Sequence, residues 1–375
     1  MGKYTIYNNS DIDNQIDKYL KRIKDEILLL INPIEIKAII LAGGFGRGEG
    51  GIWYNNGIVK PVNDFDIIVF PKRHFKKFKK KYFKDLNKIA EKIAIELEIK
   101  QIDINIGNYN KFYIRKFFLF YTVNTYEIVN GHIFLFGNIN INRLKNSYNS
   151  SKIPLIEGLK YLFTRGSGLL IAVYVNLSKK QIPLEIIYNE INKCYLAFGD
   201  SYLILKKQYH YSYAQRINIA SLQTFECPNG EIIKRKYIDS LNWKLKPEKI
   251  SADFDLESEL KNQIKLFIQY FLYFEQERLK VHFNNIYEYY KYLDKKKRPI
   301  LWYINKCDYF FDRMKLMLLL FASIYYDDNY IYLKEIETKL KINNMSQDNN
   351  SSIVNYLKIF IQIFHNEGYV KRILQ

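Results

Sequence analysis

The chain has 375 residues, 48% of them hydrophobic, which is enough for two domains with substantial cores. Lys and Arg outnumber Asp and Glu by 57 to 39, and a chain with a net charge of +18 is expected to meet nucleic acid, nucleotides or an anionic membrane surface. The three cysteines lie far apart, which argues against a disulfide framework or a zinc site and favours a reducing cytoplasm, and no window approaches the roughly 20 apolar residues of a membrane span.

The first elements alternate between helix and strand. Residues 11–32 carry apolar side chains at helical spacing, and Pro33 ends this expected helix. The mostly apolar run Ile36–Ala42 predicts a buried strand that stops at glycines. The run Val62–Phe70 predicts a second strand, which Pro71 closes.

A basic helix and less regular segments follow. Residues 72–98 favour a helix, and the strict alternation of Gln101–Ile106 predicts a third strand. Residues 111–121 fit a helix or a strand equally well. The Asn130-Gly131 pair favours a hairpin or strand pair over Tyr126–Phe136.

The character of the sequence changes after Pro154. Residues 155–222 and 256–340 predict consecutive helices, with breaks at 227–230 and 247–254. The polar stretch Asn343–Ser352 predicts a loop before a last helix over 353–366. The expected organisation is an N-terminal domain with both strands and helices over 1–150 and a helical domain over 151–375.

Six glycines crowd into the nine residues Gly43–Gly51, directly after the first strand. Glycines let the backbone approach a phosphate closely, and successive N–H groups in such a turn can bind an anion. The stretch lacks the Lys of a P-loop and the later acid of a dinucleotide fingerprint. Without further evidence it could also be a glycine-rich hairpin that binds nothing.

Two carboxylates follow in the strand that starts near residue 62. Asp64 and Asp66 are two residues apart, so on a strand they point to the same face. They repel each other unless a cation sits between them, and oxygen ligands suit Mg²⁺ or Mn²⁺. Asp103 on the next expected strand is the favoured third acid, and Glu127 is the alternative. The competing interpretation is an Asn-Asp turn that merely begins a strand.

The order G-G-x-G-R-x-E, then D-x-D, then a later strand acid resembles the DNA polymerase β-like nucleotidyltransferase superfamily. The loop Gly43–Glu49 is most similar to that of bacterial uridylyltransferases that modify nitrogen-regulatory proteins. The resemblance covers about residues 35–140, and it implies an α+β domain with a short mixed sheet and flanking helices. Twenty positions separate Gly44 from Asp64, more than is expected for the family, and the excess over Ile52–Lys60 suggests an inserted hairpin.

The resemblance implies roles for single residues. Gly43 and Gly44 would hold the nucleoside triphosphate through backbone contacts. Asp64 and Asp66 would bind two metal ions, and Asp103 would bind the catalytic one and take the proton from the acceptor hydroxyl. Arg47 would either pair with Glu49 to brace the loop or contact a phosphate.

The helical half is expected to complete the nucleotide pocket. Arg165 and Lys193 are the candidates there. Asp200 lies two helical turns from Lys193 on one face, and a buried ion pair between helices is an equally good interpretation of it. Tyr209, Tyr213 and Arg216 follow at helical spacing.

The predicted activity is transfer of a nucleoside monophosphate from an NTP to a hydroxyl acceptor, with release of pyrophosphate. RNA, including tRNA, is the acceptor that the charge favours, although the abundant Lys also fits AT-rich coding. The basic run Lys72–Lys84 is either a solvated helix face or a track for a nucleic-acid backbone. The alternatives are nucleotidylation of a protein or small molecule, a non-catalytic nucleotide- or RNA-binding protein, and a toxin–antitoxin component.

Overall fold

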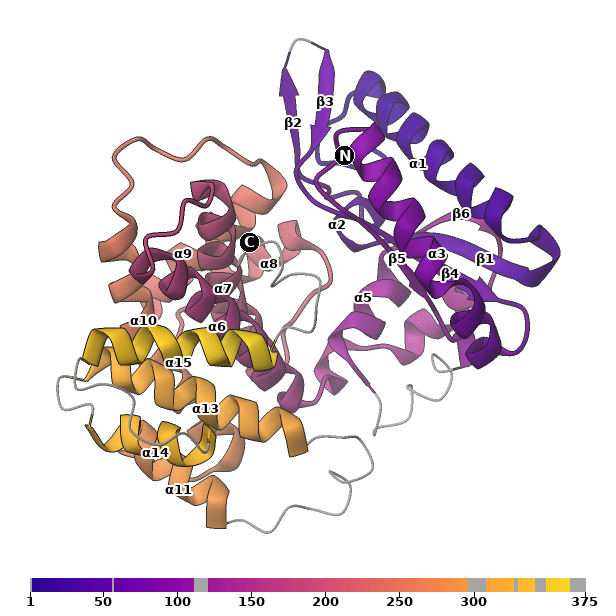
Figure 1. Ribbon diagram of the computed structural model, residues 1–375. Coiled ribbons are helices and arrows are strands. Elements are labelled where there is room, and N and C mark those ends of the chain that lie inside the picture. The colour runs from indigo at the N-terminus through magenta and orange to yellow at the C-terminus, as the bar shows by residue number, and fades with distance from the viewer. Residues whose placement is uncertain are drawn as a thin grey trace. The chain divides into compact units, whose positions relative to one another are not determined.

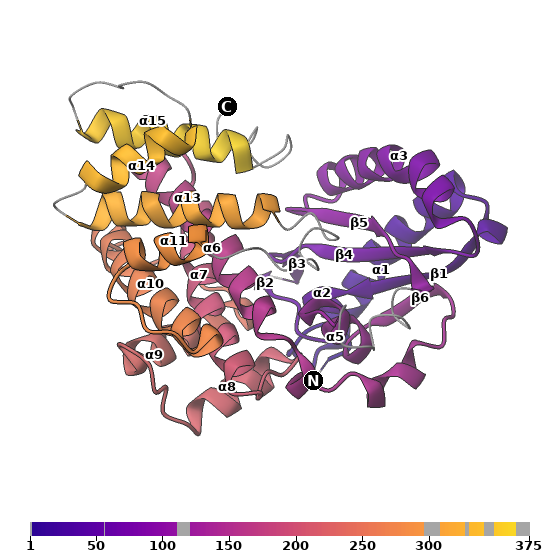
Figure 2. The same cartoon turned by 90° about the horizontal axis from the view of Figure 1, so that it is seen from below.

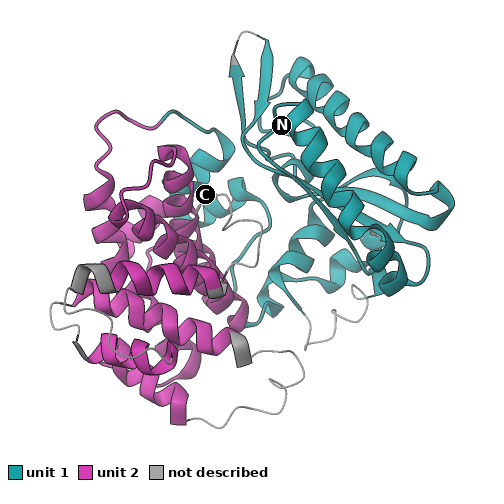
Figure 3. Cartoon of the chain, viewed as in Figure 1, with its two compact units in different colours: residues 1–154, 206–223, 238–249 teal, residues 155–205, 224–237, 250–375 magenta. Residues whose placement is uncertain are grey.

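The computed structural model describes residues 2–55, 57–110, 121–295, 308–326, 330–340 and 349–364. The chain divides into two compact units (Figure 3). Unit 1 comprises Met1–Pro154, Lys206–Gln223 and Ile238–Lys249, and unit 2 comprises the remainder. The chain therefore passes back and forth between the two units, and each unit consists of three separate stretches. Two continuous domains were expected from the sequence.

A mixed four-stranded sheet organises unit 1 (Figure 1). Its strands are β1 (Ile36–Ala42), β4 (Phe65–Pro71), β5 (Ile102–Ile106) and β6 (Ile133–Gly137), in the order β5-β4-β1-β6. β4 runs parallel to β5, and β1 is antiparallel to both β4 and β6. The expected strand and helix content of the N-terminal region is confirmed at this level.

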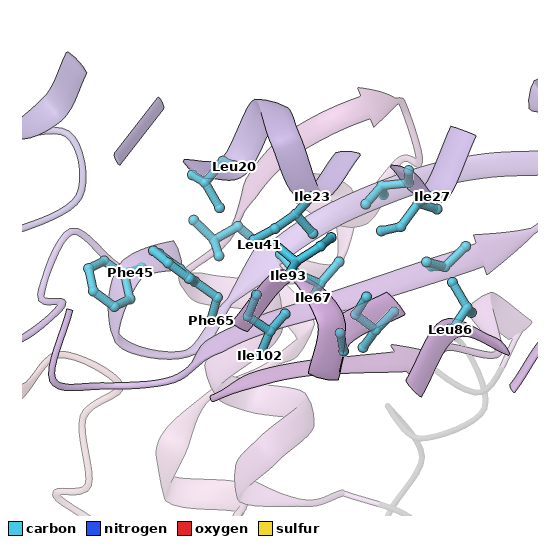
Figure 4. Close-up of a cluster of buried hydrophobic side chains, with 14 of the residues drawn as sticks. Leu20, Ile23, Ile27, Leu41, Phe45, Phe65, Ile67, Leu86, Ile93 and Ile102 are labelled. Atoms are coloured by element: carbon cyan, nitrogen blue, oxygen red, sulfur yellow. The ribbon is translucent and has the colours of Figure 1, made fainter. Parts of the chain in front are cut away.

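Helices α1 (Ser10–Leu30) and α3 (Phe75–Glu96) pack against one face of this sheet (Figures 2 and 4). Alternation along the strands supplies that face, because every second side chain points to the same side. The shared core contains Leu20 and Ile23 of α1, Leu41 of β1, Ile67 of β4 and Ile93 of α3. The other strand positions, including Asp66 and Asp103, point to the opposite face.

The spacer between the glycine loop and Asp64 is a hairpin, as the sequence predicted. β2 (Ile52–Asn55) and β3 (Ile58–Pro61) pair only with each other. The Val62 N–H donates to the Gly51 carbonyl at 2.9 Å, which closes the base of the hairpin. The insertion thus returns the chain to the end of the glycine loop.

Three sequence predictions in unit 1 need correction or lie outside the described residues. The strand expected from Val62 begins only at Phe65, so Asp64 precedes β4. The hairpin expected over Tyr126–Phe136 is wrong in its first half, where α5 (Val123–Asn130) forms. The ambiguous segment 111–121 falls outside the described residues, except for Tyr121.

The reason for the helix α5 is local. The Thr122 side chain accepts from the Thr125 N–H and caps the N-terminus. The Gly131 N–H donates to the Glu127 carbonyl, so the Asn130-Gly131 pair ends a helix instead of turning a hairpin. β6 then follows.

Unit 1 also holds short helical segments. These are η1 (Pro33–Glu35), α2 (Gly43–Gly46), η2 (Ile141–Ser147), η3 (Ser150–Lys152) and α8 (Tyr213–Ser221). The second half of α9 (Gly230–Leu245) belongs to unit 1, and its first half belongs to unit 2.

The described part of unit 2 contains helices and connecting loops but no strand, in agreement with the prediction of a helical domain. Its other helices are α6 (Leu155–Leu177), α7 (Leu184–Leu205), α10 (Leu256–Leu279), α11 (Ile286–Lys295), α13 (Asp308–Tyr325), α14 (Tyr330–Leu340) and α15 (Asn349–Phe364). The loop predicted to reach Ser352 is wrong from Asn349 onward, where α15 has begun. No helix in the described ranges has the length and apolarity that a bilayer crossing requires.

Candidate metal and nucleotide site

Two aspartates lie side by side on the sheet face that α1 and α3 leave uncovered. Asp66 of β4 and Asp103 of β5 are register partners in the parallel pair, so their side chains share a face. Ala42, the last residue of β1, is the partner of Asp66 on the other side. Both carboxylates are partly exposed, whereas Asp64 is exposed. The sheet itself therefore brings together the acids that the sequence predicted.

The glycine loop touches this acid pair. Gly43 has φ +63°, a left-handed conformation that favours glycine. A Cβ built on Gly43 would lie 1.9 Å from Asp66 Oδ2. Only a residue without a side chain allows the backbone to come this close to the carboxylate, so Gly43 and Asp66 form one site.

The charges that act on Asp66 are mostly those of other acids, and the positive charge of Arg47 opposes them only in part. Burial, reinforced by the charges of Asp64 and Asp103, raises the pKa of Asp66 from 3.8 to about 7. Asp103 Oδ1 accepts from Gln101 Nε2 at 2.7 Å. Within the described ranges, neither Asp64 nor Asp66 forms a salt bridge or a side-chain hydrogen bond. The site thus concentrates negative charge that a cation would neutralise.

Asn63 holds the rest of the loop next to the strand. Its side chain is buried, and a Cβ on Gly44 or on Gly51 would lie 3.3 Å from its Nδ2 atom. The Glu49 N–H donates to the Gly44 carbonyl at 2.8 Å, which folds the loop back on itself. Sequence reasoning did not single out Asn63, although its place directly before the acid pair was the available signal.

Arg47 and Glu49 form an ion pair that braces the loop, which is one of the two roles expected for Arg47 from the sequence. Both side chains are almost completely buried, and Arg47 Nε lies 3.6 Å from Glu49 Oε2. Glu49 also caps the N-terminus of α8: it accepts from Ser212 Oγ at 2.6 Å, from Tyr213 N at 2.8 Å and from Ala214 N at 3.1 Å. The ion pair therefore ties the glycine loop to a segment more than 160 residues later.

Glu127, the alternative candidate for the third acid, instead forms ion pairs away from Asp66. It lies on helix α5, where its carboxylate contacts Arg47 Nη1 at 3.2 Å and Arg216 Nη2 at 3.2 Å. Tyr209 OH donates to the same carboxylate at 2.6 Å. Two arginines therefore neutralise Glu127, and Asp103 is the acid beside Asp66.

Arg216 was missed as a site residue. Its guanidinium lies 4.5 Å from the ring centroid of Tyr213 and 4.7 Å from that of Tyr209. Arg47 lies 4.6 Å from the Tyr213 ring centroid. Tyr209 precedes α8, so its expected helical spacing with Tyr213 is wrong, and only the tertiary fold gathers these side chains.

Two of the three candidates in unit 2, Lys193 and Asp200, have structural partners. Lys193 Nζ lies 2.8 Å from Glu190 Oε1, one helical turn away. Asp200 accepts from the buried Tyr237 hydroxyl at 2.7 Å, a hydrogen bond between helices where an ion pair was considered. Arg165 lies on α6 and is partly exposed. A nucleotide-binding role for Arg165 and Lys193 stays a prediction.

The carboxylates fit a divalent cation by their chemistry. In the part of the chain that the structure describes, no three His, Cys, Asp or Glu side chains are close enough together to hold a metal ion. Asp66 and Asp103 nevertheless present oxygen donors from adjacent strands, with Asp64 beside them, and such donors suit Mg²⁺ and Mn²⁺. The pKa of Asp66 is raised because burial and the neighbouring acids disfavour its charged form, and a bound cation would oppose that effect.

Comparisons with known proteins add no assignment. No protein-family description matches the chain, and no curated protein matches its sequence.

Proposed function

We propose that this protein is a metal-dependent nucleotidyltransferase that moves a nucleoside monophosphate from an NTP to a hydroxyl acceptor. The observation that carries the proposal is the contact of Gly43 with Asp66, which itself lies in register with Asp103. A loop suited to phosphates and a carboxylate pair suited to metal ions thus share one site. The resemblance of the sequence motifs supports the same activity.

Each residue of the site has a proposed task. Gly43 and Gly44 let the triphosphate approach the backbone, and Asp64, Asp66 and Asp103 would hold Mg²⁺ or Mn²⁺. Such an ion, when bound, supplies positive charge to the phosphate oxygens. Asp103 accepts the proton of the acceptor hydroxyl, whose oxygen attacks the α-phosphorus while pyrophosphate leaves. Arg47 and Glu49 position the loop.

The acceptor is proposed to be a nucleic acid, because a chain with a net charge of +18 attracts polyanions. Arg165 and Lys193 are proposed to contribute to the nucleotide pocket from the helical part. The site requires NTP and a divalent cation, and the reducing cytoplasm is the proposed compartment.

Pyrophosphate release from each of the four NTPs, with Mg²⁺ or Mn²⁺ and total RNA as acceptor, tests the proposal. Asp66→Asn and Asp103→Asn should each lower the rate at least about 100-fold, because each removes a metal-binding carboxylate. Asp25→Asn is the matched control, since that carboxylate is half-exposed on α1 and lies outside the site. Full activity of both site variants would refute the metal-site assignment.

A further inference from the structure

The positive charge of the chain is concentrated at one end of helix α3. Residues 72–84 contain eight Lys or Arg and no Asp or Glu, which is a net +8 of the total +18. By contrast, helix α1 carries Lys and Arg in near balance with Asp and Glu. Uniformly basic coding would spread the cations, so their concentration on α3 needs a local cause.

Four of these basic side chains line a cavity. A hollow of about 500 Å³ lies where α3 begins, between the end of β4 and the segment before β1. The charged and polar side chains that line it are those of Glu35, Lys72, Arg73, His74, Lys77 and Lys81. Ile34 and Phe78 complete the lining. This basic cavity lies entirely within unit 1.

The charge is placed where it costs helix stability. The N-terminus of an α-helix carries partial positive charge, and acidic side chains are the favourable residues there. The first turn of α3 has no acidic residue, and its N-cap, His74, makes no capping hydrogen bond with its side chain. Glu35 is the one carboxylate of the lining, at 3.8 Å from Lys81 Nζ. Bound phosphate groups would relieve this repulsion.

The chemistry fits a nucleic-acid backbone better than a lipid surface. The aromatic side chains of α3 turn inward: Phe78 and Tyr82 are buried in the core, and Phe75 and Phe83 pack against it. A helix that binds a membrane surface exposes apolar side chains for insertion, whereas this face exposes lysines. A concave row of cations matches phosphates spaced along a strand.

We propose that the basic cavity is a docking site for a nucleic-acid backbone, separate from the carboxylate site. Residues 67–71 of β4 lie between Asp66 and Lys72, a span of about 20 Å at 3.3 Å per residue. α3 also lies on the sheet face opposite to Asp66. Docking therefore does not require the transfer reaction, and the two proposals can fail independently.

The test is the affinity for a fluorescein-labelled uridine oligonucleotide of about 20 nucleotides, measured by anisotropy between about 50 and 200 mM salt. The variant Lys72→Gln/Lys77→Gln/Lys81→Gln should bind at least about 10-fold more weakly, with a shallower salt dependence by about 2 log units per decade. The control Lys18→Gln/Lys21→Gln/Lys92→Gln removes the same charge from other exposed positions and should change the affinity less than about 2-fold.

A second variant changes the affinity in the opposite direction. Glu35→Gln keeps an acceptor for the Tyr82 hydroxyl, which donates to Glu35 at 2.8 Å, and removes the negative charge from the basic cavity. It should tighten binding of the same oligonucleotide by about 2-fold or more, because the Glu35 carboxylate no longer repels the phosphates of the oligonucleotide. Asp66→Asn should bind like the wild type, whatever its transfer activity.

Three outcomes would overturn the proposal. They are equal weakening of the cavity variant and its control, unchanged or weaker binding by Glu35→Gln, and preference for phosphatidylserine vesicles over the oligonucleotide at equal phosphate concentration. The substituted lysines are exposed at an unfavourable helix end, so the cavity variant should melt at the wild-type temperature or higher.

Discussion

At the scale of single residues, the site is defined by the contact between a backbone and a carboxylate. Gly43 adopts a left-handed conformation directly beside Asp66. Asp66 is held near Asp103 by strand register, and near Asp64 by two steps along the chain. Close approach and crowded negative charge are separate properties, and each can be perturbed on its own.

Gly43→Ala tests the close approach. The new methyl group would collide with Asp66 Oδ2, and the positive φ adds strain of about 1–2 kcal/mol. We expect the rate of pyrophosphate release to fall at least about 10-fold. The free energy of unfolding should fall by more than the backbone strain, because the collision with Asp66 adds to it.

Gly57→Ala is the matched control. Gly57 also has a positive φ, +79°, but among the described residues other than its chain neighbours no atom lies within 4 Å of its added Cβ. It should lose only the strain of about 1–2 kcal/mol and keep its activity. Equal losses in both variants would show that backbone strain, not contact with Asp66, makes Gly43 necessary.

The crowded charge predicts a pH dependence. The pKa of Asp66 is raised from 3.8 to about 7 by burial, Asp64 and Asp103, so the folded protein keeps a proton that the unfolded chain releases between these values. The free energy of unfolding of the metal-free protein should therefore fall as the pH rises from about 4 to 7, and it should stay at the lower value above pH 7.

Asp66→Asn should remove this deficit. In the presence of a chelator, denaturant unfolding at pH 8 should show the variant more stable by about 2–4 kcal/mol, and the difference should vanish below about pH 4. Mn²⁺ should stabilise the wild type and have little effect on the variant. If the metal-free wild type is equally stable at pH 4 and pH 8, the pKa of Asp66 is not raised by burial and the neighbouring acids.

At the scale of elements, the glycine loop depends on α8. Glu49 accepts hydrogen bonds from the first turn of α8, while Arg47 lies between Glu49 and Glu127 of α5. Buried charges of this kind are costly unless each is paired, so loop, α5 and α8 must form together.

Glu49→Gln tests this connection. The amide fills the same space but loses charge-assisted hydrogen bonds from Ser212 and the α8 backbone, and Arg47 loses part of its counter-charge. We expect the free energy of unfolding to fall by about 1–3 kcal/mol in urea denaturation. Glu248→Gln, an exposed acid of the same unit, should stay within about 0.5 kcal/mol of the wild type.

At the scale of the whole molecule, unit 1 is assembled from three separate stretches of chain. Lys206–Gln223 brings Ser212 to Glu49, Tyr213 to Arg47 and Arg216 to Glu127. The catalytic unit proposed here therefore includes residues that follow the first two helices of unit 2.

A fragment of residues 1–154 tests this assembly. Arg47 would keep its ion pairs with Glu49 and Glu127. Glu49 would lose its hydrogen bonds from the first turn of α8, and Glu127 would lose Arg216, at a cost of several kcal/mol in buried charge. We expect no cooperative thermal transition by circular dichroism, in contrast to the full chain. A fragment that unfolds cooperatively near the temperature of the full chain would show that the later segments are dispensable for folding.

The sequence alone determined the parts of unit 1 that depend on local periodicity. The helices predicted over 11–32 and 72–98 form over 10–30 and 75–96. The strand Ile36–Ala42 and the inserted hairpin were also predicted, because alternation and helical spacing are properties of neighbouring residues. The acids Asp66 and Asp103 could be chosen for the same reason, since each lies on a periodic strand.

Only the tertiary structure decided which residues stand around the loop. The helix α5, where a hairpin was expected, placed Glu127 against Arg47 and Arg216, away from the role of third acid. Ser212 reaches Glu49 across more than 160 residues of sequence, and Arg216 reaches Glu127 across 89. Buried charge must find its partner in space, and no spacing along the chain encodes such a partner when it comes from a distant element.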